Sequence, residues 1–446
     1  MNIKNNSILF YTLTGLSAIG YFLFAYHTQR ADFANVFVIY AALFLLFVGM
    51  YQTQKNNFLT LAGVGILFRI IFFVAIPNLS QDFYRFIWDG RMLLNGFNPY
   101  LFTPESFIQS GELPINQAQE LYEGMGQLNG SNFTNYPPIN QLCFVLANLF
   151  GTNSILGSVI GLRFQIILAD IGILYFGKKL LEKLHLPVSA IFLYFLNPFI
   201  IIELTGNLHF EGVMLFFLVW SLYLLHTQKW KWAAIVLALS VSVKLIPLIF
   251  LPLFYQRFKL KQLLVFYGIT LIAIALLFIP FFNTVFIANY SQSVGLWFRS
   301  FEFNASFYYL ARAIGYQISG YNQIAIIGKI IPLVVILIVL IFSFFRENKT
   351  SQQLITVMLL SLSVYFFLST TVHPWYVATL VLLSVFSKYR FALVWSFAVI
   401  LSYSAYTNNQ FNENLWLVAL EYSLVLGWFI WELFLSNKHS HIAYKQ

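Results

Sequence analysis

Long apolar segments recur along almost the whole chain. A helix needs about 20 apolar residues to cross the hydrocarbon core of a bilayer. The segments near that length are 8–26, 36–52, 58–77, 155–178, 188–204, 211–227, 263–281, 322–345, 353–371, 391–406 and 414–435. Only 9% of the residues are charged, whereas about 25% is usual in a soluble domain. This composition excludes a soluble enzyme and a disordered chain, so we expect an all-α polytopic integral membrane protein.

Other apolar segments are too short to cross as straight helices. They are 137–150, 375–387, and the pair 232–243 with 245–256. Lys244 and Pro247 interrupt the pair, and a lysine is costly in the membrane interior. Since basic residues flank both sides, we expect 232–256 to be a re-entrant helix pair with Lys244 near its outer apex. The chain would then hold about 11–14 membrane helices, counted from their lengths, in a single transmembrane domain of residues 1–446.

Basic residues set the expected orientation. If the N-terminus lies inside and the chain alternates, most of the 25 Lys and Arg residues fall in inside segments. The net charge of +9 is then a topology signal, and no nucleic-acid partner is expected. Both termini are expected in the cytoplasm. Residues 137–150 are expected to enter the membrane without crossing it. The large outer loops are 78–136, with an amphipathic helix, and 282–321.

The first outer loop carries an unusual group of charges. If 81–95 is helical, Asp82, Arg85 and Asp89 share one face. Apolar positions such as Phe83 and Phe86 then lie on the membrane. The helix is either an interfacial element with self-paired charges or the support for a catalytic carboxylate. In the second reading Asp82 is a general base that Arg85 keeps ionised.

Further polar residues converge on the same outer face. Together with Arg85 and Asp89, the candidates for contacting substrate are Asn207, His209, Glu211, Lys244, Arg299, Asn304, His373, Trp375 and Tyr376. His373 is a candidate catalytic residue that donates a hydrogen bond to a phosphate, and Lys244 and Arg299 are candidate phosphate ligands. Lys244 is expected to be free to bind a phosphate unless it forms an ion pair with Glu203 or Glu211. One His and one Glu near 207–211 make a poor ligand set, so no metal is expected.

Arg163 and Asp170 occupy one apolar segment, seven residues apart. This spacing predicts an internal structural ion pair. The chain has no phosphate-binding glycine loop, dinucleotide fingerprint or nucleophile elbow. An outward-facing transferase without a nucleotide domain would draw its sugar from a lipid carrier, and no cofactor is expected.

Several motifs together resemble the GT-C superfamily of membrane glycosyltransferases. They are Asp82-Phe83-Tyr84-Arg85 through Asn98-Pro99-Tyr100 to Tyr136-Pro137-Pro138, Asn207-Leu208-His209-Phe210-Glu211-Gly212, Lys244-Leu245-Ile246-Pro247, and Phe303-Asn304-Ala305-Ser306 with His373-Pro374-Trp375-Tyr376. The chain looks most similar to bacterial polyprenyl-phosphate-mannose-dependent mannosyltransferases, including those that act on phosphatidylinositol mannosides. Two helices within 1–57 precede the usual first helix. Asp82 and Asp89 are farther apart than the paired acids of many relatives, which favours a structural role for Asp89.

The resemblance implies an inverting, metal-independent transfer of a hexose, with mannose favoured. The donor is a polyprenyl-phosphate sugar, the acceptor is a lipid or glycan, and Asp82 is the base. His373 and Lys244 or Arg299 stabilise the departing phosphate. The site then faces the periplasm or outside of a bacterial inner membrane. The alternatives are a flippase or transporter and a polymerase or ligase of lipid-linked glycans.

Overall fold

The computed structural model describes residues 3–151, 154–296, 300–409 and 411–435. Helices dominate these ranges, and the β-type pairing within them is an isolated bridge between Phe303 and Thr371. The elements are α1 (Ile3–His27), α2 (Phe33–Gln54), α3 (Phe58–Ile71), α4 (Asp82–Leu94), α5 (Pro104–Ser110), α6 (Ala118–Gly130), α7 (Pro138–Gly151), α8 (Ile155–Lys183), η1 (Val188–Ile191), α9 (Phe192–Phe195), α10 (Pro198–Ile200), η2 (Ile201–Gly206), α11 (Glu211–His226), α12 (Trp230–Val241), η3 (Ile246–Arg257), α13 (Leu260–Phe278), η4 (Ile279–Phe281), α14 (Phe286–Gly295), α15 (Phe307–Ser319), α16 (Ile324–Phe345), α17 (Ser351–Leu368), η6 (Pro374–Tyr376), α18 (Val377–Val385), α19 (Phe391–Ala398), η7 (Val399–Asn409), α20 (Leu415–Ile430) and η8 (Trp431–Leu435).

Long apolar helices form the body of the molecule. The described residues contain 7 helices long and apolar enough to cross a membrane, or 8 if one bent pair is a single span. The pair, Val188–Phe195 and Pro198–Gly206, bends by 49°. Pro198 explains the bend, because proline fits the first turn of a new helix and disrupts a continuing one. The Asn197 side chain caps that turn by accepting from the Phe199 N–H at 3.0 Å. The all-α polytopic architecture is therefore confirmed.

Burial separates the inner helices from the outer ones. Every residue of α18 is buried, as expected for a helix that is apolar all round and surrounded by protein. By contrast, α13 and α16 expose long apolar faces, which suit contact with lipid. Three segments predicted as spans are shorter helices, namely Phe58–Ile71, Glu211–His226 and Phe391–Thr407.

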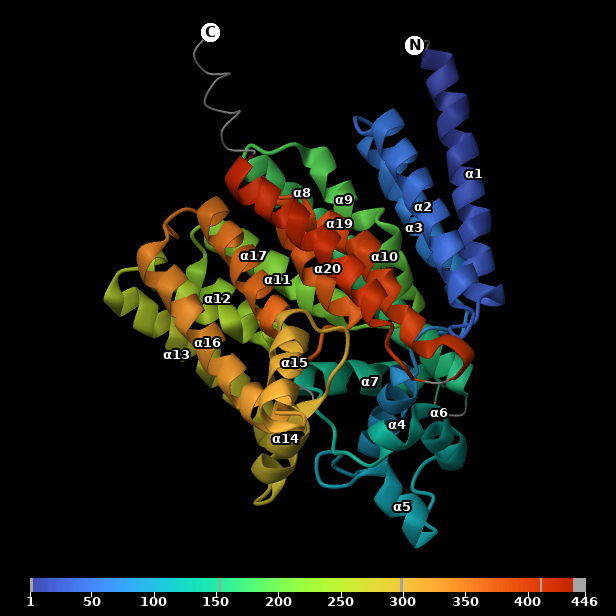
Figure 1. Cartoon of the computed structure of the whole chain (residues 1–446), viewed down its shortest axis with the longest axis vertical. Coiled ribbons are helices and arrows are strands. Elements are labelled where there is room, and N and C mark those ends of the chain that lie inside the picture. Colours follow the sequence, from blue (N-terminus) through green and yellow to red (C-terminus); the bar gives the residue numbers. More distant parts are fainter. Residues whose placement is uncertain (1–2, 152–153, 297–299, 410, 436–446) are drawn as a thin grey trace.

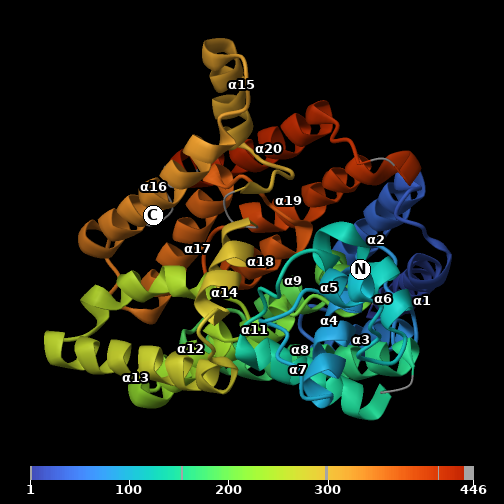
Figure 2. The ribbon, with the colours of Figure 1, turned by 90° about the horizontal axis from the view of Figure 1, so that it is seen from below.

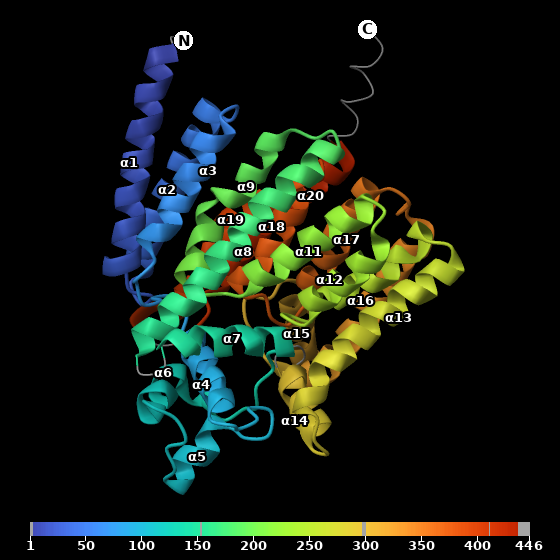
Figure 3. The same cartoon turned by 180° about the vertical axis from the view of Figure 1, so that it is seen from behind.

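The first outer loop folds into a helical layer at one end of the bundle. In Figures 1 and 3, α4, α5 and α6 lie at the end opposite the start of α1 and the end of η8. Helix α7 lies across the long helices there and packs against α4 and α8. Figure 2 shows from that end that α4–α6 and α14–α15 occupy separate areas.

Helix α4 matches the expected amphipathic helix in its bounds but not in its environment. Phe83, Phe86 and Ile87 are buried inside the protein, not laid on a membrane surface. Phe86 stacks on Phe144 of α7 with 4.7 Å between ring centroids. The prediction of a membrane-facing side was wrong, because α6 of the same loop and α7 after it cover that side.

The predicted pair at 232–256 is a helix, a break and a second helix. Helix α12 ends at Val241, and η3 begins at Ile246 with Pro247 in its first turn. Helix η3 packs against α12, α16 and α17. The break places Lys244 beside the loop layer, where the ring of Tyr136 lies 5.4 Å from its ammonium group.

Candidate active site

A cavity of about 310 Å³ lies where the loop layer meets the helix bundle. Its walls come from segments far apart in the chain: the α1–α2 connection, the start of α4, the end of α6 with the residues that lead from it to Tyr136, Lys244, Phe301 and Phe303, residues 373–376, and Tyr403, Tyr406 and Phe411. Ligand-binding pockets usually measure about 300–1,000 Å³, so this one suits a ligand the size of a single sugar.

Half of the predicted site residues line this cavity. They are Asp82, Arg85, Lys244, His373, Trp375 and Tyr376. Asp89, Asn207, His209, Glu211 and Asn304 are buried outside its lining. Arg299 lies outside the described residues.

Asp82 is the first residue of α4, where the helix dipole favours a negative charge. Its carboxylate is partly buried and accepts from the Asn129 side-chain amide at 3.5 Å. Burial raises the pKa of Asp82 above its usual range, while Lys244, Asn129 and Arg30 act in the opposite direction. Glu211 adds to the rise in this pKa. A carboxylate with a raised pKa is a stronger base than an ordinary one.

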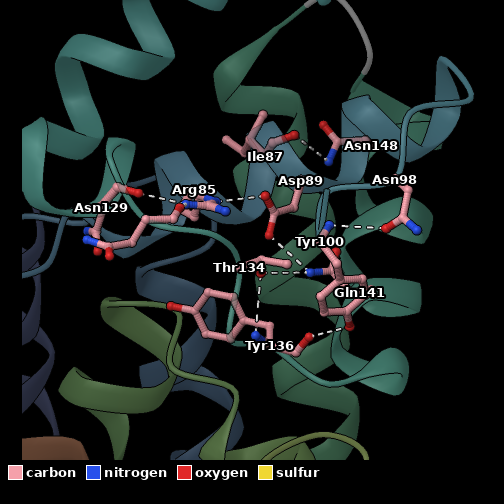
Figure 4. A network of polar contacts seen from close by, with 11 residues as sticks. Arg85, Ile87, Asp89, Asn98, Tyr100, Asn129, Thr134, Tyr136, Gln141 and Asn148 are labelled. Carbon is pink, nitrogen blue, oxygen red and sulfur yellow. Dashed lines mark hydrogen bonds and ion pairs between the residues drawn. The ribbon is translucent and has the colours of Figure 1, made fainter. Parts of the chain in front are cut away.

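Arg85 does not pair with Asp82, so the expectation that it holds that carboxylate ionised was wrong. Its Nε donates to Asp89 Oδ1 at 2.7 Å, and its Nη1 donates to the carbonyl oxygen of Asn129 (Figure 4). The same Nη1 also donates to the carbonyl oxygen of Asn132. Gln141 of α7 donates to Asp89 Oδ2 at 3.0 Å. The Arg85–Asp89 pair thus ties α4 to the end of α6 and to α7.

Lys244 forms an ion pair with Glu211 at 3.0 Å. This was one of the two partners that the sequence left open. The other, Glu203, instead accepts from the Tyr403 hydroxyl at 2.8 and 3.1 Å. Glu211 thereby holds the Lys244 ammonium at the cavity wall.

Trp375 lies between two imidazole rings. Its centroid is 3.7 Å from that of His209 and 4.6 Å from that of His373, with nearly parallel planes. Burial and the Lys244 charge lower the pKa of His373 to about 3. The same causes, with His373 itself, hold the pKa of His209 well below its usual value. Both rings are therefore neutral, and a neutral imidazole retains one N–H donor.

Asn207 and Asn304 are buried outside the cavity lining and hold segments that form its walls. Asn207 Oδ1 accepts from the Leu79 N–H at 3.1 Å, which fixes the segment leading into Asp82. Asn304 has a φ of 47°, a conformation that asparagine tolerates better than most residues. Its side chain donates to Glu421 at 3.1 Å, which anchors the 301–304 wall.

Sequence reasoning missed Arg30, Asn129, Tyr403 and Tyr406, which also line the cavity. The one usable signal was Arg30 itself, a basic residue in a short connection assigned to the outer side. Within the described ranges, no group of three or more His, Cys, Asp or Glu side chains is placed to hold a metal ion.

Arg163 and Asp170 do not form the expected pair within α8. Asp170 instead accepts from Arg69 Nε of α3 at 2.7 Å. Arg163 donates to the carbonyl oxygens of Phe73, Thr205 and Gly206. The carbonyls at the end of η2 have no partner within their own helix, so a buried guanidinium satisfies them.

Comparison with known proteins identifies the family. The family model described as "Alpha-(1->6)-mannopyranosyltransferase, N-terminal domain" matches residues 17–258. This range includes Asp82 and Lys244 but ends before His373. A similar curated protein is "Alpha-(1->6)-mannopyranosyltransferase A" of Corynebacterium glutamicum, 24% identical over 202 residues. That alignment covers 43% of this chain and 38% of the relative, so the match spans well under half of each. The family match covers more than half of the chain, which therefore belongs to the alpha-(1->6)-mannopyranosyltransferase family.

Proposed function

We propose that the protein is an inverting, metal-independent mannosyltransferase that uses a polyprenyl-phosphate sugar. The observation that carries the proposal is the shared cavity of Asp82 with Lys244, Arg30 and His373. A basic carboxylate that shares a cavity with cations and a neutral hydrogen-bond donor suits attack at one end of a sugar phosphate and departure at the other. Membership of a mannosyltransferase family supports the choice of mannose.

Asp82 begins the reaction by accepting the proton of the acceptor hydroxyl. The hydroxyl oxygen then forms a bond to the anomeric carbon, and the bond from that carbon to the phosphate oxygen breaks. Polyprenyl phosphate leaves with the bonding electron pair, and the anomeric configuration inverts. Lys244 and the N–H of His373 face the oxygens on which negative charge develops, and Arg299 remains a further candidate ligand.

The other predicted residues divide into two groups by their places. Trp375 and Tyr376 line the cavity and offer aromatic surface to the sugar. Glu211, Asn207 and His209 act through other residues, by holding Lys244, Leu79 and Trp375 respectively. Asn304 and Asp89 likewise position the walls instead of contacting substrate.

The site faces the outside of a bacterial inner membrane in this proposal, and both termini face the cytoplasm. The cavity lies at the loop-layer end of the bundle, away from the start of α1 (Figure 1). Basic residues flank the opposite ends of several helices, as at Lys178, Lys179 and Lys183 of α8. A lipid-linked donor reaches such a site within the membrane plane.

The product linkage sharpens the chemistry. If the product is an α-(1→6)-mannoside, as in the family name, an inverting enzyme requires a β-linked donor. The test uses purified protein in nanodiscs with radiolabelled polyprenyl-phosphate-mannose of either anomeric configuration, a lipid extract of the source cell as acceptor, and EDTA in a parallel sample. We expect label in a new α-mannoside only from the β-donor, with and without EDTA.

Four outcomes would contradict parts of this proposal. Transfer from the α-donor would contradict inversion, and loss of transfer in EDTA that added Mg²⁺ or Mn²⁺ restores would contradict metal independence. Movement of intact donor across the membrane without a new glycosidic bond would favour a flippase. Assembly of long glycans from preformed lipid-linked units would favour a polymerase.

A further inference from the structure

The cavity contains three cations within the described residues, and they differ in how far their charges are already neutralised. Arg85 pairs with Asp89 at 2.7 Å, and Lys244 pairs with Glu211 at 3.0 Å. Arg30 has no carboxylate at ion-pair distance within the described parts of the chain. A partly buried cation without a counter-ion is a natural site for an anionic ligand.

The contacts of Arg30 hold its side chain without neutralising it. Nη1 donates to the Leu79 carbonyl oxygen at 3.2 Å, and Cζ lies 4.3 Å from the ring centroid of Tyr406. A guanidinium carries five N–H donors in a planar fork that matches two oxygens of a phosphoryl group. One hydrogen bond and one ring contact leave most of that fork available.

The backbone around Arg30 is fixed to the segment that leads into Asp82. Asn78 Nδ2 donates to the carbonyl oxygens of Phe24 and Thr28 at 2.6 and 2.9 Å. Asp32 caps the next helix by accepting from the Asn35 N–H at 3.1 Å. The α1–α2 connection therefore presents Arg30 in a defined position, which reduces the entropy lost when a ligand binds.

Arg30 and Asp82 line one cavity but form no ion pair. Inversion requires this separation, because the sugar carbon must lie between the base and the leaving group. Arg30 also lines an adjoining cavity of about 540 Å³, which shares Leu79, Ser80, Gln81 and Tyr406 with the first. A ligand can therefore reach the guanidinium from outside the smaller cavity.

We infer that Arg30 binds the phosphoryl group of the lipid-linked donor, and that α1 and α2 serve to deliver this residue. The inference rests on the proposed function. It adds a phosphate ligand from the connection between the two N-terminal helices. The sequence indicates no role for these helices beyond their place before the usual first helix. A phospholipid headgroup offers the same phosphoryl chemistry, so the test separates the two sources.

The test measures equilibrium binding of ³²P-labelled polyprenyl phosphate to protein in phosphatidylcholine nanodiscs. The proteins are the wild type, Arg30→Gln, Arg30→Lys and the control Lys329→Gln. Lys329 is an exposed cation of α16 that does not line the cavity. Unlabelled polyprenol is the uncharged competitor, and phosphatidylglycerol in the nanodisc is the phospholipid competitor.

We expect Arg30→Gln to weaken binding on the order of 10- to 100-fold, as loss of a charged hydrogen-bond donor predicts. Arg30→Lys, which keeps the charge but not the fork, should bind with intermediate affinity. Lys329→Gln should bind as the wild type does. In turnover, Arg30→Gln should raise the KM for the donor and leave the KM for the acceptor unchanged.

Each contrary outcome has a distinct meaning. If the wild type binds polyprenyl phosphate and Arg30→Gln binds it equally well, the inference fails and the proposed function stands. If phosphatidylglycerol displaces the labelled lipid as well as unlabelled polyprenyl phosphate does, Arg30 is a headgroup site and the inference also fails. If polyprenol competes as well as polyprenyl phosphate even in the wild type, both the inference and the proposed donor fail. Should Arg30→Gln not fold, Arg30→Lys decides by the same comparison.

Discussion

Charged side chains have different surroundings in two regions of the molecule, the interior of the helix bundle and the cavity at its loop-layer end. In the interior, Arg69 and Asp170 are fully buried and 2.7 Å apart. Arg69 also donates to the carbonyl oxygens of Gly65 and Phe195. In the cavity, Asp82 has one amide contact at 3.5 Å, and Arg30 has one carbonyl contact.

The number of partners distinguishes charges that stabilise the fold from charges that are free to bind a ligand. A buried charge without a partner costs several kcal/mol, so the interior gives its charges partners: a carboxylate for Arg69 and backbone carbonyl oxygens for Arg163. The cavity keeps charges whose hydrogen-bonding capacity is only partly used, and a bound substrate would supply the rest. Substitutions in the two regions should therefore affect different measurements.

The largest expected effect is on turnover at Asp82. Asp82→Asn removes the basic oxygen but keeps the shape, so turnover should fall by about 10² to 10⁴-fold. The measurement is initial-rate transfer in nanodiscs, alongside the thermal unfolding midpoint. That midpoint should stay close to wild type, because the interior pairs are untouched.

Asp89→Asn is the matched control on the same helix. Asp89 is fully buried against Arg85 and Gln141 and does not line the cavity. Its loss should lower the unfolding midpoint more than Asp82→Asn does, and it should reduce turnover less per folded molecule. The reverse pattern would mean that Asp89 is the base.

The next largest effect is on stability at Arg69. Arg69→Ala leaves the buried Asp170 carboxylate without its cation, which should cost about 3–5 kcal/mol of unfolding free energy. Chemical denaturation in detergent measures this loss. The double variant Arg69→Met with Asp170→Leu should recover most of it, since it buries no unpaired charge. An unchanged midpoint in Arg69→Ala would remove the distinction drawn between the two regions.

The sequence predicts the helices well, and it predicts that several polar residues from separate segments lie together. Hydropathy indicates the long helices, and the positions of basic residues predict that Asp82, Lys244 and His373 share one side of the membrane. In the structure these three residues line one cavity. Hydropathy is a property of one segment of the chain, and the distribution of basic residues is a sum over many positions. They do not depend on which side chains meet.

The sequence does not predict which charged side chains contact one another. Arg163 and Asp170 look like a pair because they share a helix, yet their partners come from α3 and from the end of η2. Arg30 is a single basic residue in a short connection, with no periodicity to mark it. Its role emerges only when α1 and α2 pack beside the segment that leads into Asp82. Tertiary packing decides both cases.

A smaller effect is expected at His373. The ring is neutral because its pKa is lowered to about 3, so it contributes one ordinary hydrogen bond and a stacking surface. His373→Ala should reduce turnover by about 3- to 10-fold, the worth of a neutral hydrogen bond. The pH profile of kcat/KM, which reports the pKa values of the free enzyme, should show no step near pH 6.5 that His373→Ala removes. Such a step would show that a protonated imidazole takes part.

The smallest effect is a shift in the pH profile. Asp82 must be ionised to act as a base, so kcat/KM should rise with pH through its pKa, which burial has moved upward. Lys244 lowers this pKa and Glu211 raises it. Lys244→Gln should therefore move the rising limb to higher pH, and Glu211→Gln should move it to lower pH. Because the two residues form one ion pair, a purely structural role would shift the rising limb in the same direction in both variants, or in neither. Opposite shifts would place the titrating group in the field of both charges, which is the position of Asp82.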